Sequence, residues 1–127
     1  MIVVDASAAV LALLNDGDAR AVIADEPVAV PHLVDSEVAN ALRSQVLRGT
    51  IDADSATTAL VGWGQLGLRR CGITALLPRI WELRDNVTAY DATYLALAEA
   101  LDSDLVTADA RLARAAGPTC TVRVVRH

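Results

Sequence analysis

The sequence predicts an α/β fold with a central, mainly parallel sheet of about four to five short strands between two layers of helices. Short apolar runs alternate along the chain with longer segments whose apolar residues recur at helical spacing. Two of these runs, Met1–Asp5 and Leu105–Asp109, end in an aspartate and lead directly into a helix-forming segment. Parallel strands present their carboxyl ends at one edge of the sheet, where α/β proteins bind ligands, so both aspartates are expected there.

Turn residues separate the predicted elements in the first half of the chain. Asn15–Asp18 is a polar turn, prolines bracket the apolar run 27–31, and Gly49 ends a long helical pattern. The elements expected here are a strand at 1–5, helices at 6–14 and 19–25, a strand at 27–31, a helix at 32–48, and a helix that opens at Asp52–Asp54 and runs to the glycine-rich stretch 62–67.

The second half repeats the alternation, and the strongest amphipathic pattern, Tyr90–Leu101, lies in it. Pro78 falls inside another helical pattern, so the pattern does not fix where that helix begins. The elements expected here are a strand at 68–73, helices at 74–84 and 90–101, a strand at 105–107, a helix at 110–116 and a strand at 121–125. Residues 1–127 have the length of one ordinary domain.

The composition excludes several classes of protein. Hydrophobic residues make up 54% of the chain, which excludes disorder, and with no Phe the core must be filled by Ala, Val and Leu. Cys71 and Cys120 are isolated, so we expect neither a zinc site nor a disulfide framework but buried thiols in a reduced compartment. The chain shows neither a positively charged leader nor an uncharged stretch of membrane-spanning length, so we expect a cytoplasmic protein.

The charges give a second set of exclusions. The net charge is −5, and all eleven basic residues are arginines. The absence of lysine excludes a P-loop and Schiff-base chemistry. An acidic chain disfavours a nucleic-acid partner unless several acids bind divalent cations, in which case the arginines are free to contact phosphates.

Four acids occupy positions from which they would reach one pocket. Asp5 and Asp109 end strands, Glu37 lies on the apolar face of a helical stretch, and Asp91 is in the first turn of a helix. Each has a simpler explanation when taken alone. The three aspartates would serve as helix caps, and Glu37 would be a solvated surface residue.

Four short motifs carry a family resemblance. They are Val-Asp-Ala-Ser at Asp5, Glu37 followed by Val-Ala-Asn-Ala-Leu, Tyr-Asp-Ala-Thr-Tyr-Leu-Ala-Leu-Ala at Asp91, and Leu-Val-Thr-Ala-Asp-Ala-Arg-Leu at Asp109. In this order and spacing, the chain resembles the PIN domain family and, in size, the VapC toxins of bacterial toxin–antitoxin pairs.

The resemblance covers the whole chain and implies a three-layer, Rossmann-like PIN domain over residues 1–127. It implies a metal-dependent endoribonuclease that acts as the toxin of such a pair, with a small VapB-like antitoxin and a homodimeric assembly. It also implies that Asp5, Glu37, Asp91 and Asp109 are the catalytic and metal-binding residues. The glycine-rich stretch 62–67 has no strong counterpart, so substrate choice does not carry over.

All-carboxylate ligands suit Mg²⁺ or Mn²⁺. We expect Asp5 and Asp91 to hold the main ion, and Glu37 and Asp109 to complete or position a second one. Ser7 and Thr107 are expected either to hydrogen-bond a ligand carboxylate or metal-bound water, or to cap the backbone. Asn40 lies one helical turn after Glu37 and is either a partner of it or a surface amide.

Contact with RNA would have to come from arginines. The candidates are Arg43, Arg69, Arg70, Arg84, Arg111 and Arg114. Trp63 and Trp81 are able to stack on bases, although a core or subunit-interface position is favoured for both. Neither His32 nor His127 is expected to bind a metal.

Other functions compete with the nuclease. A phosphatase of the haloacid dehalogenase type needs a second Asp where Ser7 stands, and a lysine that this chain lacks. A catalytically inactive PIN-like module that binds RNA or protein is the main alternative, and the intact set of four acids disfavours it. A nuclease directed at DNA also stays open, because no residue identifies a reader of the ribose 2′-hydroxyl.

Overall fold

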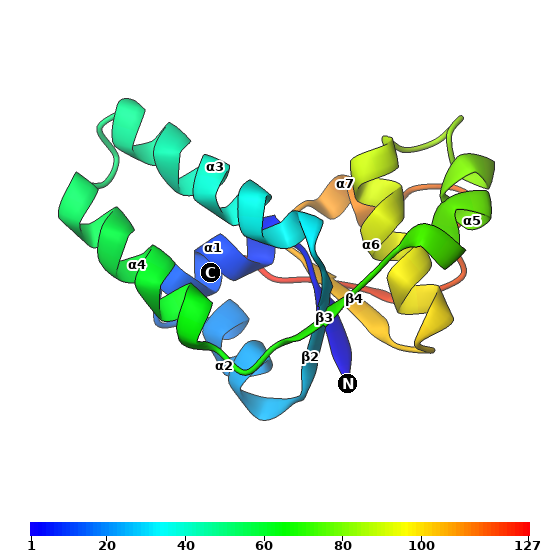
Figure 1. Ribbon diagram of the computed structural model, residues 1–127, viewed down its shortest axis with the longest axis horizontal. Coiled ribbons are helices and arrows are strands. Elements are labelled where there is room, and N and C mark those ends of the chain that lie inside the picture. The colour runs from blue at the N-terminus through cyan, green and yellow to red at the C-terminus, as the bar shows by residue number, and fades with distance from the viewer.

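The computed structural model describes residues 1–127 and consists of five strands and seven α-helices (Figure 1). The strands are β1 (Ile2–Val4), β2 (Val28–Pro31), β3 (Arg69–Cys71), β4 (Asp104–Thr107) and β5 (Val122–Val124). The helices are α1 (Ala6–Leu14), α2 (Asp18–Asp25), α3 (Leu33–Leu47), α4 (Ala53–Gln65), α5 (Leu77–Glu82), α6 (Ala89–Ala100) and α7 (Ala110–Ala113), with a 3₁₀ turn at Thr74–Leu76.

The strands form one sheet in the order β3-β2-β1-β4-β5. All four pairings are parallel, so the predicted α/β fold is confirmed and its sheet is wholly parallel. β1 is the central strand, and Val4 is in register with Val106 of β4. The segments that follow β1 and β4 therefore leave the carboxyl edge of the sheet side by side, although about a hundred residues separate them.

Helices cover both faces of the sheet and complete three layers (Figure 1). α6 packs on β1, β2 and β4, and α5 packs against α6. On the other face, α1 packs against α2, α3 and α4. Buried Val, Ala and Leu side chains dominate the core, as the composition requires. None of the helices combines the length and the apolar character needed to cross a bilayer.

Two predicted helix boundaries change for identifiable reasons. The predicted helix at 110–116 ends at Ala113, and the chain turns away at Gly117, whose φ of +103° is in the region that favours glycine. The segment 74–84 divides into a 3₁₀ turn and then α5, with Pro78 in the first turn of the helix. A proline is tolerated there because the N–H it lacks would have no partner within the helix.

A polar clamp ties α3, α4 and β3 together at the edge of the sheet. The Asp35 carboxylate on α3 accepts hydrogen bonds at 2.8 Å from Trp63 Nε1 on α4 and from two guanidinium nitrogens of Arg70 on β3. The paired arginine holds the pKa of Asp35 below its ordinary value. Because the Trp63 ring is also buried, these contacts hold α3 against α4 and β3.

The central strands carry much of the stability, because their side chains are buried on both faces. Leu105 is fully buried in β4. We expect Leu105→Ala to lower the free energy of unfolding by about 2–5 kcal/mol, because it opens a cavity in a packed core. Leu47→Ala is the control, since Leu47 is 68% exposed and its truncation should cost less than about 0.5 kcal/mol. Urea unfolding followed by circular dichroism measures both, and equal losses would contradict this account of the core.

Candidate functional site

The four acids singled out in the sequence come from four elements around the carboxyl edge of the sheet. Asp5 directly follows β1 and its N–H donates to Val106 O of β4 at 3.1 Å. Asp109 lies two residues after β4, Glu37 is on α3, and Asp91 is on α6. In Figure 1, α3 and α6 flank this edge from opposite sides.

Asp5 is buried and its carboxylate is held by three donors. Ser7 Oγ and the Ala8 N–H donate to Oδ1 at 2.6 and 3.0 Å, and the Thr107 hydroxyl donates to Oδ2. The Ala8 bond makes Asp5 the N-cap of α1, so its capping role is real. Burial nevertheless raises the pKa of Asp5 above its ordinary value, and the charge of Asp91 adds to this, while the hydrogen bonds oppose it.

Ser7 and Thr107 connect the two strand ends. The Ser7 hydroxyl accepts from the Ala108 N–H at 2.9 Å, and the Thr107 hydroxyl accepts from the Asp109 N–H at 3.0 Å. Each hydroxyl therefore binds the Asp5 carboxylate and caps the backbone at once. The two roles that the sequence left open for Ser7 and Thr107 are both present.

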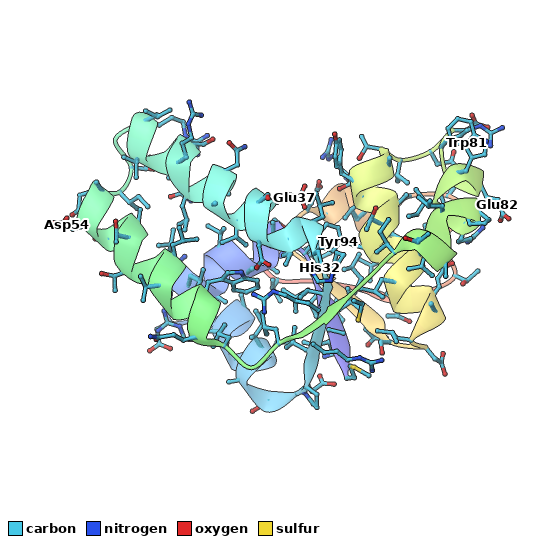
Figure 2. All side chains as sticks on the ribbon, viewed as in Figure 1. His32, Glu37, Asp54, Trp81, Glu82 and Tyr94 are labelled. Atoms are coloured by element: carbon cyan, nitrogen blue, oxygen red, sulfur yellow. The ribbon has the colours of Figure 1, made fainter.

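Glu37 is half-buried and points toward α6, where the Tyr94 hydroxyl donates a hydrogen bond to its Oε1 (Figure 2). Desolvation raises the pKa of Glu37, and the charges of Asp5 and Asp91 raise it further. A surface position for Glu37 is thus wrong. Tyr94 was missed as a site residue, although its place three residues after Asp91 on the same helix face was a usable signal.

Asp91 lies in the first turn of α6, but Thr88 is the N-cap of that helix and accepts a hydrogen bond from the Asp91 N–H at 3.1 Å. The capping explanation for Asp91 is therefore wrong. Burial raises the pKa of Asp91, and the charge of Asp109 contributes in the same direction. The half-buried carboxylate lies near other acids and is not a helix cap.

Asp109 differs from the other three acids. It caps α7 through the Arg111 N–H at 3.0 Å, and the guanidinium of Arg111 binds its carboxylate, with a shortest contact of 2.6 Å. Hydrogen bonding from Arg111 holds the pKa of Asp109 below its ordinary value. Arg111, expected to contact RNA, is thus engaged with an acid of the site.

The causes of the pKa shifts indicate that the four acids lie near one another. Asp5 and Asp91 each affect Glu37, Asp91 affects Asp5, and Asp109 affects Asp91. As the side chains are oriented, no three His, Cys, Asp or Glu residues form a group ready to hold an ion. Holding an ion therefore requires side-chain rotation, above all release of Asp109 from Arg111.

The remaining candidates occupy varied positions. Arg70 is bound to Asp35, and Arg69 lies at the amino end of an edge strand. Trp63 is buried as expected, whereas Trp81 is 67% exposed, so the prediction of a core position is wrong for Trp81. Asn40 is exposed and forms no hydrogen bond with Glu37. Cys71 and Cys120 are free and only half-buried.

Comparisons with known proteins give a consistent result. The family model for the PIN domain matches residues 2–118. The chain is 53% identical over 125 residues to ribonuclease VapC9 of Mycobacterium tuberculosis H37Rv, and the match covers 98% of each chain. Among solved structures, PAE2754 from Pyrobaculum aerophilum is similar with a TM-score of 0.68 and 28% identity, over 95% of this chain and 81% of that one. VapBC2 from Rickettsia felis, bound to a DNA fragment from its promoter, shares the fold with a TM-score of 0.69 at 15% identity, over 98% of both chains.

The crowding of acids has a consequence for stability in the absence of metal. Folding raises the pKa of Asp91, so ionising this carboxyl costs more in the folded state than in the unfolded state. The free energy of unfolding therefore falls as the pH rises from the ordinary pKa of Asp91 through its folded pKa. We expect Asp91→Asn to be more stable than the parent chain at pH 7, by a fraction of a kcal/mol because solvent screens a half-exposed group. The difference should vanish below about pH 3, where the carboxyl is protonated in both states.

Urea unfolding in chelator between pH 3 and pH 8 measures this difference. Asp16→Asn, at an exposed turn position, is the control and should change stability by less than about 0.5 kcal/mol throughout. An Asp91→Asn variant that is less stable than the parent chain at pH 7 would contradict the destabilising effect that we ascribe to the burial of Asp91 and to the nearby charge of Asp109.

Proposed function

This chain belongs to the PIN domain family, and on that premise we propose that it is an endoribonuclease that hydrolyses RNA phosphodiester bonds with Mg²⁺ or Mn²⁺. The proposal extends to the role of toxin in a toxin–antitoxin pair. It is supported by similarity to a VapC ribonuclease along nearly the whole chain. The observation that carries it is the placement of Asp5, Glu37, Asp91 and Asp109 on four elements that meet at the carboxyl edge of the sheet.

The donor set fits a hard divalent cation. All four acids offer oxygen, and the Ser7 and Thr107 hydroxyls bonded to Asp5 are oxygen donors as well. Three of the carboxyls have raised pKa values because they are desolvated and repel one another, and a bound cation relieves both costs. We assign the main ion to Asp5 and Asp91, and a second one to Glu37 and Asp109.

When bound, the ions supply charge neutralisation at the phosphodiester and lower the pKa of a coordinated water. The chain itself holds the carboxylates in position. Asp5 is fixed by Ser7, Ala8 and Thr107, so its oxygens are in place before an ion arrives. Tyr94 holds Glu37 toward the same edge from the opposite side. The Thr107 hydroxyl accepts from the Asp109 N–H and donates to Asp5, so it links the end of β4 to the end of β1.

We further propose a small antitoxin as the partner. The pairing of Arg111 with Asp109 supports this idea, because it shows that a guanidinium fits against an acid of the site. A partner arginine would bind a second carboxylate in the same bidentate way and would compete with the cation. The homodimer stays a prediction. An RNA substrate and two free cysteines are consistent with action in the cytoplasm.

Substitution of the acids tests the catalytic assignment. We expect Asp5→Ala and Asp91→Asn to reduce Mg²⁺-dependent cleavage of RNA by more than about 100-fold, beyond the loss typical for outer-sphere partners. Asp54→Asn is the matched control, because Asp54 is exposed on α4 and should leave the rate unchanged. The assay follows labelled RNA on gels with and without chelator, and circular dichroism checks the fold. Full activity in either acid variant, or cleavage that persists in chelator, would remove the assignment.

Partner binding is tested by competition with the cation. The probe is a synthetic peptide that contains one arginine and has the sequence of a segment of a small protein that co-purifies with this chain. We expect this peptide to inhibit cleavage, and we expect its affinity to fall as Mg²⁺ increases. Replacement of the arginine by lysine should weaken binding by about tenfold, because the bidentate contact is lost. Inhibition that is independent of Mg²⁺ would show that the peptide acts elsewhere.

A further inference from the structure

A pocket of about 530 Å³ lies beside Asp91, between the loop that joins α5 to α6 and the helix α7. Its polar lining includes Arg84, Asn86, Thr88, Asp91 and Arg111. Asp91 and Arg111 also belong to the acidic site, so the pocket is continuous with it. A strand of nucleic acid whose phosphodiester lies at the four acids would have a neighbouring nucleotide at this pocket.

Arg84 is a cation that no carboxylate neutralises. Four other arginines are paired with acids, namely Arg70, Arg79, Arg111 and Arg123. Arg84 instead donates to the Trp81 carbonyl oxygen at 2.9 Å, and its guanidinium lies over the Trp81 ring at 4.8 Å from the ring centroid. The side chain is therefore ordered while its charge stays available.

Trp81 completes an exposed stacking surface. The residue is 67% exposed and lies at the outer end of α5, away from the body of the protein (Figure 2). Arg84 lines the pocket, and its guanidinium stacks on the Trp81 ring just outside that lining; we call this pair the Trp81–Arg84 platform. Both aromatic rings and guanidinium planes are surfaces on which unpaired bases stack.

We propose that the pocket and the Trp81–Arg84 platform form a binding subsite for one nucleotide of single-stranded RNA, next to the cleaved phosphodiester. The base stacks on the platform, and its phosphate contacts Arg84. This inference rests on the proposed ribonuclease function and adds the strand state of the substrate and the place of a flanking nucleotide. Asp85 also lines the pocket, so stacking supplies more of the affinity here than net charge does.

The experiment measures RNA binding in a chain made inactive by Glu37→Gln, which keeps an oxygen to accept the Tyr94 hydrogen bond. The probe is a fluorescein-labelled, unstructured single-stranded RNA, followed by anisotropy across a range of salt concentrations in Mg²⁺. The variants added to this background are Trp81→Ala, Trp81→Phe, Arg84→Ala and the control Arg69→Ala. Arg69 is exposed, and it begins an edge strand at the opposite, amino end of the sheet.

We expect Trp81→Ala to raise Kd about tenfold and Trp81→Phe to restore most of the affinity, because a ring is still present. We expect Arg84→Ala to weaken binding and to reduce the slope of log Kd against log salt by about 0.7, the value for one phosphate contact on a single strand. Trp81→Ala should leave this slope unchanged, and Arg69→Ala should leave both quantities unchanged. In the active chain, Trp81→Ala should raise KM for RNA and leave kcat unchanged.

Unchanged Kd and salt slope in the Trp81→Ala and Arg84→Ala variants would overturn the subsite, even if the parent chain cleaves RNA normally. Loss of binding to a partner protein with unchanged binding of RNA would assign the platform to that protein and would equally overturn the proposal. If the parent chain cleaves no RNA in Mg²⁺ or Mn²⁺ but binding still depends on Trp81, the proposed function fails, and with it the place of the nucleotide beside a cleaved bond, while the platform stands as a binding site for single-stranded RNA.

Discussion

The site depends on a buried carboxyl group at the end of the central strand. Burial of Asp5 opposes its charge, and an unpaired buried charge would be expensive. Hydroxyls from Ser7 and Thr107 and the first turn of α1 offset that cost. Because β1 pairs with both β2 and β4, an anchor at the end of β1 is the natural reference point for groups arriving from either side.

The other acids are distinguished by what each is bonded to. Tyr94 binds Glu37, Arg111 binds Asp109, and Thr88 accepts a hydrogen bond from the backbone N–H of Asp91. Tyr94 is a neutral hydrogen-bond donor to Glu37, whereas Arg111 is a cation that balances the charge of Asp109. These two contacts help to explain how the four acids lie near one another in the folded chain.

Periodicity and turn residues predicted almost every strand and helix, because parallel strands buried on both faces appear in a sequence as short apolar runs. The proximity of Asp5 and Asp109 was also predictable, since the ends of neighbouring parallel strands meet at one edge of the sheet. Long-range hydrogen bonds were not. The contacts of Glu37 with Tyr94 and of Asp35 with Trp63 and Arg70 join residues from 28 to 57 positions apart, and neither pattern nor composition encodes such pairs. The exposure of Trp81 was equally hidden, because hydrophobic character alone predicts a buried ring.

The register of the central strands also orders events during synthesis. β1 is the first strand to leave the ribosome, but its neighbour β4 begins at Asp104, and the Thr107 hydroxyl that holds Asp5 arrives later still. A nascent chain therefore lacks the second half of the pocket until nearly all of its 127 residues have been translated. A protein built in this way cannot bring its four acids together while most of the polypeptide is still being made.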